Sequence, residues 1–132
     1  ARFPNPRFDD VPRRVEHWSM PADTAVQAAV TLMSDLGRTV PDGTANIFAP
    51  LPSFWSDQFD VRVQGYGTSV ACDETRVLEG DFGDGWKSRG VTVGHYRDGR
   101  LVGCLVAGGT PAQRMKARRL VEESTQIRAV AL

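Results

Sequence analysis

The chain has 132 residues, of which 41% are hydrophobic and 24% are charged. This is the composition of an ordinary globular protein with room for one core. The 16 basic and 16 acidic side chains cancel, so no overall charge favours nucleic acid or an anionic membrane as a partner. No run approaches the roughly 20 apolar residues of a membrane-spanning helix.

Residues that could carry metal or nucleophilic chemistry are few and isolated. Cys72 and Cys104 are far apart, as are the histidines, His17 and His95, so neither pair has metal-ligand or redox spacing. No serine lies in a nucleophile-elbow pattern. We therefore predict no metal site and no catalytic residue, and a reduced cytoplasmic protein is the default.

The N-terminal residues 1–12 contain three prolines and little apolar periodicity. Proline fixes φ and removes a backbone donor. We therefore predict an extended or irregular arm, in which Phe3 and Phe8 need a surface to cover them.

A helix is predicted from about Pro21 to Leu36. Ser19 is the candidate N-cap, Pro21 suits the first helical position and Gly37 provides the stop. Six apolar side chains fall on one face at helical spacing, and they are Ala22, Val26, Ala29, Val30, Met33 and Leu36.

An aromatic segment, Leu51–Asp60, follows a connector rich in Gly, Pro and Asp and leads into a predicted strand. Residues 59–64 alternate apolar and polar side chains, as a half-buried antiparallel strand does. Residues 75–80 form a weaker second strand. Residues 80–90 are predicted to be a loop whose one large apolar residue is Trp86.

The last third of the chain has the clearest local signals. Asp98-Gly99 is a favoured two-residue turn in a hairpin spanning Val91–Ala107. Thr110, followed by Pro111 and Gln113, opens a helix that ends near Thr125. Strands after a helix, joined by hairpins, predict an α+β fold with a small, mainly antiparallel sheet flanked by two helices.

Two glycine-rich runs, Gly65–Gly67 and Gly80–Gly85, do not open a βαβ unit. A dinucleotide pyrophosphate needs a Gly-x-Gly-x-x-Gly turn at a helix start. The second run is also acidic and would repel phosphate. We therefore interpret both as ordinary turns or loops.

The run Phe54-Trp55-Ser56-Asp57-Gln58-Phe59-Asp60 resembles the signature of the C-terminal domain of flavin-dependent ferredoxin reductases, the family of putidaredoxin and rubredoxin reductases. Residues 14–18 resemble the segment that closes the FAD domain of that family. Residues 97–103 and 117–120 resemble its final hairpin and helix. The resemblance covers most of the chain.

The resemblance implies a division into residues 1–40, the end of an FAD-binding domain, and residues 41–132, the reductase C-terminal domain. In the family, a Gly-Asp pair directly precedes a segment resembling Ala1–Asn5. We therefore expect a fragment of a longer protein, inactive alone and unable to hold FAD by itself, whose FAD and NAD domains are missing.

The resemblance also assigns cofactor contacts to this chain. Glu16, His17 and Trp18 match residues beside the flavin at the start of the helix, and Trp55 would face the flavin or the acceptor. Met20-Pro21-Ala22 departs from the family pattern, and Pro21 removes one N–H that would face the flavin. Hydride transfer needs ring alignment more than a protein acid, so Glu16 and His17 are assigned structural or flavin-edge roles.

Plainer interpretations of these residues stay open. Trp55 could be a core residue, and Phe54 is assigned to packing. Asp57 and Gln58 either contact the flavin or pin a loop. Four basic side chains on the last helix either steer an acidic ferredoxin or form a solvated face, and they are Arg114, Lys116, Arg118 and Arg119.

The function implied by the resemblance is electron transfer from NAD(P)H through FAD to a ferredoxin-type iron–sulfur protein. This chain would supply one wall of the flavin site and part of the docking surface. The alternative is a stand-alone α+β interaction or dimerisation module without redox activity. A parent with a decayed flavin site is a third reading. Three alternatives stay open. They are the identity of the acceptor, the choice of NADH or NADPH, and the oligomeric state, for which a homodimer is one option.

Overall fold

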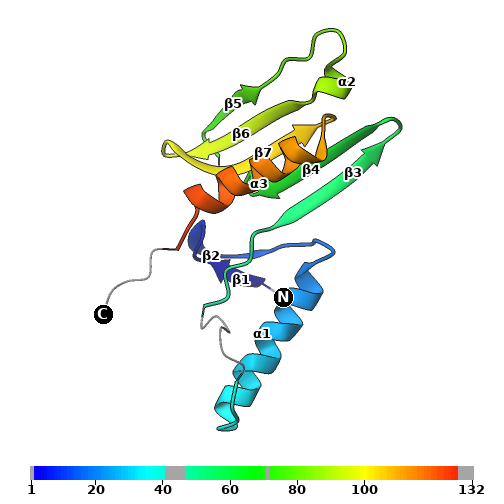
Figure 1. The fold of residues 1–132 in the computed structure, drawn as a ribbon. Helices are drawn as coiled ribbons and strands as arrows, with labels where there is room; N and C mark the ends of the chain where they lie inside the picture. The colour runs from blue at the N-terminus through cyan, green and yellow to red at the C-terminus, as the bar shows by residue number, and fades with distance from the viewer. Residues whose placement is uncertain (1, 41–46, 71, 128–132) are drawn as a thin grey trace. The chain divides into compact units, whose positions relative to one another are not determined.

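The computed structural model describes residues 2–40, 47–70 and 72–127. The chain divides between Pro50 and Leu51 into two units (Figure 1). We call Ala1–Pro50 the N-terminal unit and Leu51–Leu132 the C-terminal unit. Each unit is described by itself.

The N-terminal unit begins with a two-stranded antiparallel sheet of β1 (Arg2–Asn5) and β2 (Asp9–Arg14). The backbone predicted to be an extended or irregular arm is extended, and it is paired into strands, which the prediction did not include. Buried Asn5 organises the turn, because its side chain accepts from the Arg7 N–H at 3.2 Å and donates to the Pro50 carbonyl at 2.8 Å. The Phe3 ring is covered by Phe48, with ring centroids 5.0 Å apart.

Helix α1 (Met20–Asp35) agrees with the predicted helix and ends as expected. Gly37 has φ of 64°. Its N–H donates to the Ser34 carbonyl, and the Arg38 N–H donates to the Met33 carbonyl, both at 2.9 Å. These two bonds form a Schellman motif, in which glycine takes the left-handed position at no steric cost.

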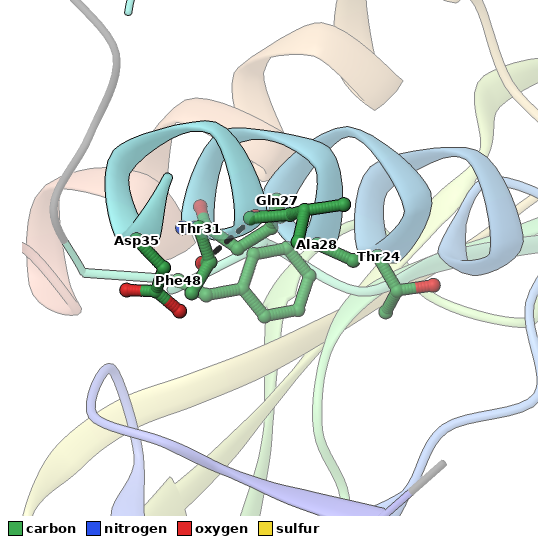
Figure 2. Close-up of a pocket in the computed structure, with 7 residues that line it drawn as sticks. Thr24, Gln27, Ala28, Thr31, Asp35 and Phe48 are labelled. Carbon is green, nitrogen blue, oxygen red and sulfur yellow. Dashed lines mark hydrogen bonds between the residues drawn. The ribbon is translucent and has the colours of Figure 1, made fainter. Parts of the chain in front are cut away.

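The apolar face of α1 is exposed. Val26 is 65% and Leu36 66% exposed, and Met20 alone among the described residues of α1 is buried. Phe48 instead lies against the opposite, mostly polar side of α1 (Figure 2). At 3.6 residues per turn that side carries Thr24, Gln27, Ala28, Thr31, Leu32 and Asp35.

The C-terminal unit contains a five-stranded antiparallel sheet with strand order β3-β4-β7-β6-β5 (Figure 1). The strands are β3 (Ser53–Gln58), β4 (Val61–Gly67), β5 (Glu74–Glu79), β6 (Val91–Arg97) and β7 (Arg100–Ala107). The predicted α+β class with an antiparallel sheet is therefore confirmed.

Two helices complete this unit. Short α2 (Trp86–Arg89) lies within the segment predicted to be a loop. Helix α3 (Pro111–Ser124) starts with the predicted capping box, in which the Gln113 N–H donates to Thr110 Oγ1 at 3.3 Å and Gln113 Oε1 accepts from the Thr110 N–H at 2.8 Å. α3 packs on β7 and β4.

The core lies between α3 and the central strands. Its buried side chains are Leu101, Cys104, Val106, Ala117 and Val121, with Leu51, Tyr66 and Tyr96 packed at their margin. Leu120, also on α3, lies at the surface. The hairpin turn is as predicted, with positive φ at both Asp98 and Gly99.

One predicted strand is displaced. The aromatic segment forms β3 itself, and Phe59-Asp60 is a two-residue turn between β3 and β4, because Gln58 pairs with Val61. Phe59 has φ of 55° and a fully exposed side chain. Alternation from Phe59 to Val63 had suggested one strand, although the real alternation begins only at Val61.

Candidate functional site

The segment before α1 lines a hollow of about 720 Å³ in the N-terminal unit. Glu16, His17 and Trp18, which the sequence singled out, all line it, together with Phe3 and Met20 and with Val15, Pro21 and Thr24. Trp18 presents an indole that is 87% exposed. The hollow therefore combines flat apolar surface with one carboxylate and one imidazole.

Polar groups around this hollow are partly committed to the chain itself. The Glu16 carboxylate pairs with the Arg14 guanidinium at 2.7 Å. The His17 carbonyl accepts from the Met20 N–H at 3.2 Å, and Pro21 has no N–H. At the first two positions of α1, therefore, no backbone N–H is available to a bound group.

The start of α1 also lacks the side-chain cap that the sequence predicted. Ser19 occupies the N-cap position but has φ of −74° and ψ of −28°, and its hydroxyl makes no capping bond. An N-cap residue that accepts from the helix normally has extended dihedral angles. The Ser19 hydroxyl therefore does not compete for the helix N-terminus.

Trp55 lies on β3 in the C-terminal unit, outside the core. Its side chain is 47% exposed, and the Arg62 guanidinium lies 5.9 Å from the centroid of its ring. Asp57, two residues further along β3, is 3.8 Å from Arg62. Trp55, Asp57 and Arg62 thus form a surface cluster, which we call the hairpin cluster.

Neighbouring residues of the aromatic segment serve packing and turn formation. Phe54 points to the other face of the sheet and lies over Gly65, where any Cβ would collide with its ring. Gln58 donates to Ser56 Oγ at 2.5 Å. The Phe54 position agrees with the packing role expected from sequence, and Gln58 has a local partner.

The four basic side chains of α3 differ in their surroundings. Lys116 pairs with Glu79 at 2.7 Å, and Arg118 with Glu122 at 2.8 Å. Arg114 donates to the carbonyls of Gly108 and Gly109, at 3.3 Å each. Within the described part of the chain, Arg119 makes no ion pair. The positive face of α3 is therefore partly neutralised by its own neighbours.

Tyr66 connects the hairpin cluster electrostatically with α3. Burial raises the pKa of the Tyr66 phenol, while the positive charges of Arg118, Arg114 and Arg62 oppose that shift. These three guanidinium groups come from both β4 and α3. Basic side chains of the hairpin and of α3 therefore act on the same phenol.

Sequence inspection missed Arg62, although a signal for it was present. Once β3 pairs with β4, Asp57 lies opposite Arg62 and Trp55 lies opposite Gln64. Arg62 is then the diagonal neighbour of Trp55, within reach of a long side chain. The misplaced strand boundary concealed this register.

Other chemistry is not evident in the described residues. Across residues 2–40, 47–70 and 72–127, no three His, Cys, Asp or Glu side chains gather as metal ligands do. None of the helices described there is long and apolar enough to cross a membrane. Burial raises the pKa of the Cys104 thiol to about 11, so it is a poor nucleophile at neutral pH.

Comparison with known proteins gives a consistent match. A family model described as "Reductase C-terminal" matches residues 53–132. The chain is 34% identical to a monodehydroascorbate reductase of Pisum sativum over 96% of its length, and 33% identical to a ferredoxin–NAD(P)(+) reductase of Sphingomonas sp over 90%. It spans only 29% and 25% of those relatives.

Solved structures show the same relationship. The ferredoxin reductase for the CYP199A2 system from Rhodopseudomonas palustris has a TM-score of 0.66 and 26% identity, over 88% of this chain and 25% of that chain. A covalent putidaredoxin reductase–putidaredoxin complex contains a chain with a TM-score of 0.70. This second match has 20% identity over 94% of this chain and 26% of that chain. It therefore shows similarity of fold alone.

Proposed function

Because the chain belongs to the reductase C-terminal family, which its residues 53–132 match, we propose that it is the C-terminal part of a longer flavoprotein. The parent passes electrons from NAD(P)H through FAD to a ferredoxin-type acceptor. The chain spans about a quarter of its relatives. Its FAD and NAD domains would then lie elsewhere in the same protein, and this portion alone would be inactive.

The observation that carries this proposal is the uncovered apolar face of α1. Among the residues that the structure describes in the N-terminal unit, Phe48 lies on the polar side of α1 and not on its apolar face. An apolar stripe on an amphipathic helix normally faces a core. The face bearing Val26, Met33 and Leu36 therefore suits the rest of an FAD-binding domain, with residues 1–40 as the end of that domain and residues 41–132 as the next.

The residues beside the hollow fit one edge of a flavin rather than a whole FAD. The exposed Trp18 indole, Phe3 and Met20 offer apolar surface to a flat ring, and Glu16 and His17 offer polar groups at its margin. No Gly-x-Gly-x-x-Gly turn is present to hold the pyrophosphate. FAD, when bound to the parent, would supply the conversion of a two-electron donor into single-electron steps.

The acceptor surface is assigned to Trp55 and to the basic face of α3. Exposed tryptophans are frequent anchors of protein interfaces. Arg114, Lys116, Arg118 and Arg119 would steer an acidic iron–sulfur protein by long-range attraction. Lys116 and Arg118 have acidic neighbours, so steering would depend on the net field of this surface more than on any single charge. A cytoplasmic location belongs to the same proposal.

The test uses the full-length parent with Trp55→Ala. We expect electron transfer to the acceptor to slow by about tenfold, as for loss of an interface anchor, with little change in flavin reduction by NAD(P)H. Stopped-flow absorbance measures both steps. Trp55→Phe should recover part of the rate, and Trp86→Phe, at a tryptophan packed against Phe82, is the matched control. Equal, small effects on both steps would contradict an acceptor role for Trp55.

The second candidate is an interaction module without redox activity. The exposed apolar face of α1 and the bare Phe59 side chain would then be its binding surfaces. The coding sequence upstream of Ala1 separates the two candidates. Two Gly-x-Gly-x-x-Gly units on βαβ patterns establish the reductase, and a short upstream region without them leaves the interaction module.

A further inference from the structure

The hairpin cluster shares one cation between two partners. Arg62 lies over the Trp55 ring at 5.9 Å from its centroid and lies 3.8 Å from the nearest Asp57 oxygen. Both separations are near the outer limits of a cation–π contact and of an ion pair. Neither contact therefore uses the full hydrogen-bonding capacity of the Arg62 guanidinium.

The exposure of the cluster leaves Arg62 open to a third group. Its side chain is 44% exposed and that of Asp57 is 60% exposed. A guanidinium has five N–H donors, arranged so that two of them match one carboxylate. An approaching carboxylate could thus bind Arg62 in a better geometry than Asp57 does.

We propose that Arg62 is a positioning residue for Trp55, and that Asp57 occupies the place a carboxylate of an acidic protein partner takes on docking. This inference rests on the proposed acceptor surface and names how that surface selects its partner. Asp57 then acts as an internal competitor that weakens docking. Arg62 restrains the indole through this contact and supplies the charge that the partner recognises.

The surrounding charges favour an acidic protein surface as the occupant. The positive charges of Arg114 and Arg118 on α3, and of Arg62 on β4, all oppose the rise in the pKa of the Tyr66 phenol. Two of these cations have an acidic neighbour, since Arg118 pairs with Glu122 and Arg62 lies 3.8 Å from Asp57. The hairpin cluster is exposed, and further basic side chains lie on α3, which suits a protein surface carrying several carboxylates.

The same hairpin offers a matched control. Asp60, in the turn after β3, accepts from Lys87 Nζ at 2.7 and 2.9 Å through its two oxygens. Asp60→Asn removes the same charge as Asp57→Asn. It leaves Arg62 and Trp55 with their partners.

The first experiment uses the whole chain with Trp18→Phe and Trp86→Phe, so that Trp55 is the one fluorescent indole. Poly-L-glutamate is the probe of acidic surfaces, and poly-L-lysine controls for sign. We expect Asp57→Asn to tighten poly-L-glutamate binding by about two- to fivefold at low salt, the scale of one exposed ion pair. Asp60→Asn should change it by much less.

Arg62 variants complete the design. Arg62→Gln should weaken poly-L-glutamate binding, because it removes the cation. It should also lower the fluorescence anisotropy of Trp55, because the indole loses its contact with the guanidinium. Arg62→Lys should restore part of the binding and less of the anisotropy, since an ammonium lacks the planar fork. In the Arg62→Gln background, Asp57→Asn should add no tightening, because the cation for which Asp57 competes is gone.

Two results would overturn the proposal. Equal tightening by Asp57→Asn and Asp60→Asn would mean that only net charge matters. Unchanged Trp55 anisotropy in a folded Arg62→Gln variant, with folding checked by circular dichroism, would mean that Arg62 does not position the indole.

Failure of the proposed function would show up separately, in the full-length parent. If Asp57→Asn tightened poly-L-glutamate binding but left the salt dependence of acceptor reduction unchanged, the competition at Arg62 would stand. The electron acceptor would then not be the partner that this cluster selects.

Discussion

The two units use apolar side chains in opposite ways. In the C-terminal unit, Val106 and Val121 are fully buried between α3 and the sheet. In the N-terminal unit, α1 has an equally regular apolar stripe, yet Val26 and Leu36 on that stripe are exposed. Helical periodicity thus identifies the face that favours burial, and a core forms only where the same chain also supplies the surface that covers it.

The helix starts repeat this contrast. In α3 the Thr110 side chain and Gln113 satisfy each other's backbone groups in a capping box. In α1 the Ser19 hydroxyl makes no such bond. Local signals and packing therefore agree in the C-terminal unit, and such agreement is what makes a fold cooperative. In the N-terminal unit, the same helix has an exposed apolar face and no side-chain cap at its start.

Amide hydrogen exchange should give the largest difference between the units. We expect amides of β7, the central strand, to exchange about 10³-fold more slowly than those of α1, because local opening is cheap where few apolar side chains are buried. Mass spectrometry of peptic fragments measures both in one sample. Equal protection of α1 and β7 would show that the N-terminal unit is as stable as the sheet. It would contradict the proposed difference in stability between the two units.

Truncating one valine in each unit sharpens the comparison. Val121→Ala should lower the free energy of unfolding by about 2 kcal/mol, because it leaves a cavity under α3. Val26→Ala should be neutral or stabilising by up to about 0.5 kcal/mol, since an exposed helical site favours alanine. Urea denaturation monitored by circular dichroism measures both. A comparable loss for Val26→Ala would reveal a cover on α1.

The two caps give a smaller effect. Thr110→Ala should cost about 1 kcal/mol, because it removes the side chain that accepts from the Gln113 N–H. Ser19→Ala should cost a few tenths at most, because no capping bond is lost. The same urea titrations measure these changes. Losses of equal size would mean that the Ser19 hydroxyl caps α1 in solution.

The smallest expected effect concerns pH and the contact of Glu79, on β5, with Lys116 and Gln113, on α3. Hydrogen bonds from Lys116 and then Gln113 lower the pKa of Glu79 below 4.5. A carboxylate with a lowered pKa stabilises the fold above its unfolded pKa, and that stability is lost as pH falls through the folded value. Glu79→Gln should therefore lower Tm slightly at pH 7 and hardly at pH 3. An equal fall in Tm at both pH values would show that the contact of Glu79 with α3 is not electrostatic.

The elements that the sequence predicted well are those with strong local chemistry. The Asp98-Gly99 turn, the Thr110 capping box and the Gly37 stop each depend on residues a few positions apart. The element it displaced, the Phe59–Gln64 strand, depends on pairing across the sheet. Phe59 takes a positive φ that a bulky residue rarely adopts, so no local rule would have placed a turn there.

The candidate site was predicted in part for the same reason. Trp18, Glu16 and His17 were grouped from the sequence and line one hollow, because they are adjacent along the chain. Arg62 was not connected with Trp55, because that contact exists only once β3 and β4 are paired in register.

The pair formed by Phe54 and Gly65 has an evolutionary consequence. The aromatic ring fills the space in which any side chain at position 65 would stand, so a mutation at either site alters the fitness of mutations at the other. Loss of the ring would uncover a bare stretch of backbone, and gain of a side chain at position 65 would expel the ring. Among relatives that keep this hairpin, the two positions should therefore change together, and an aromatic residue at the first should be accompanied by glycine at the second.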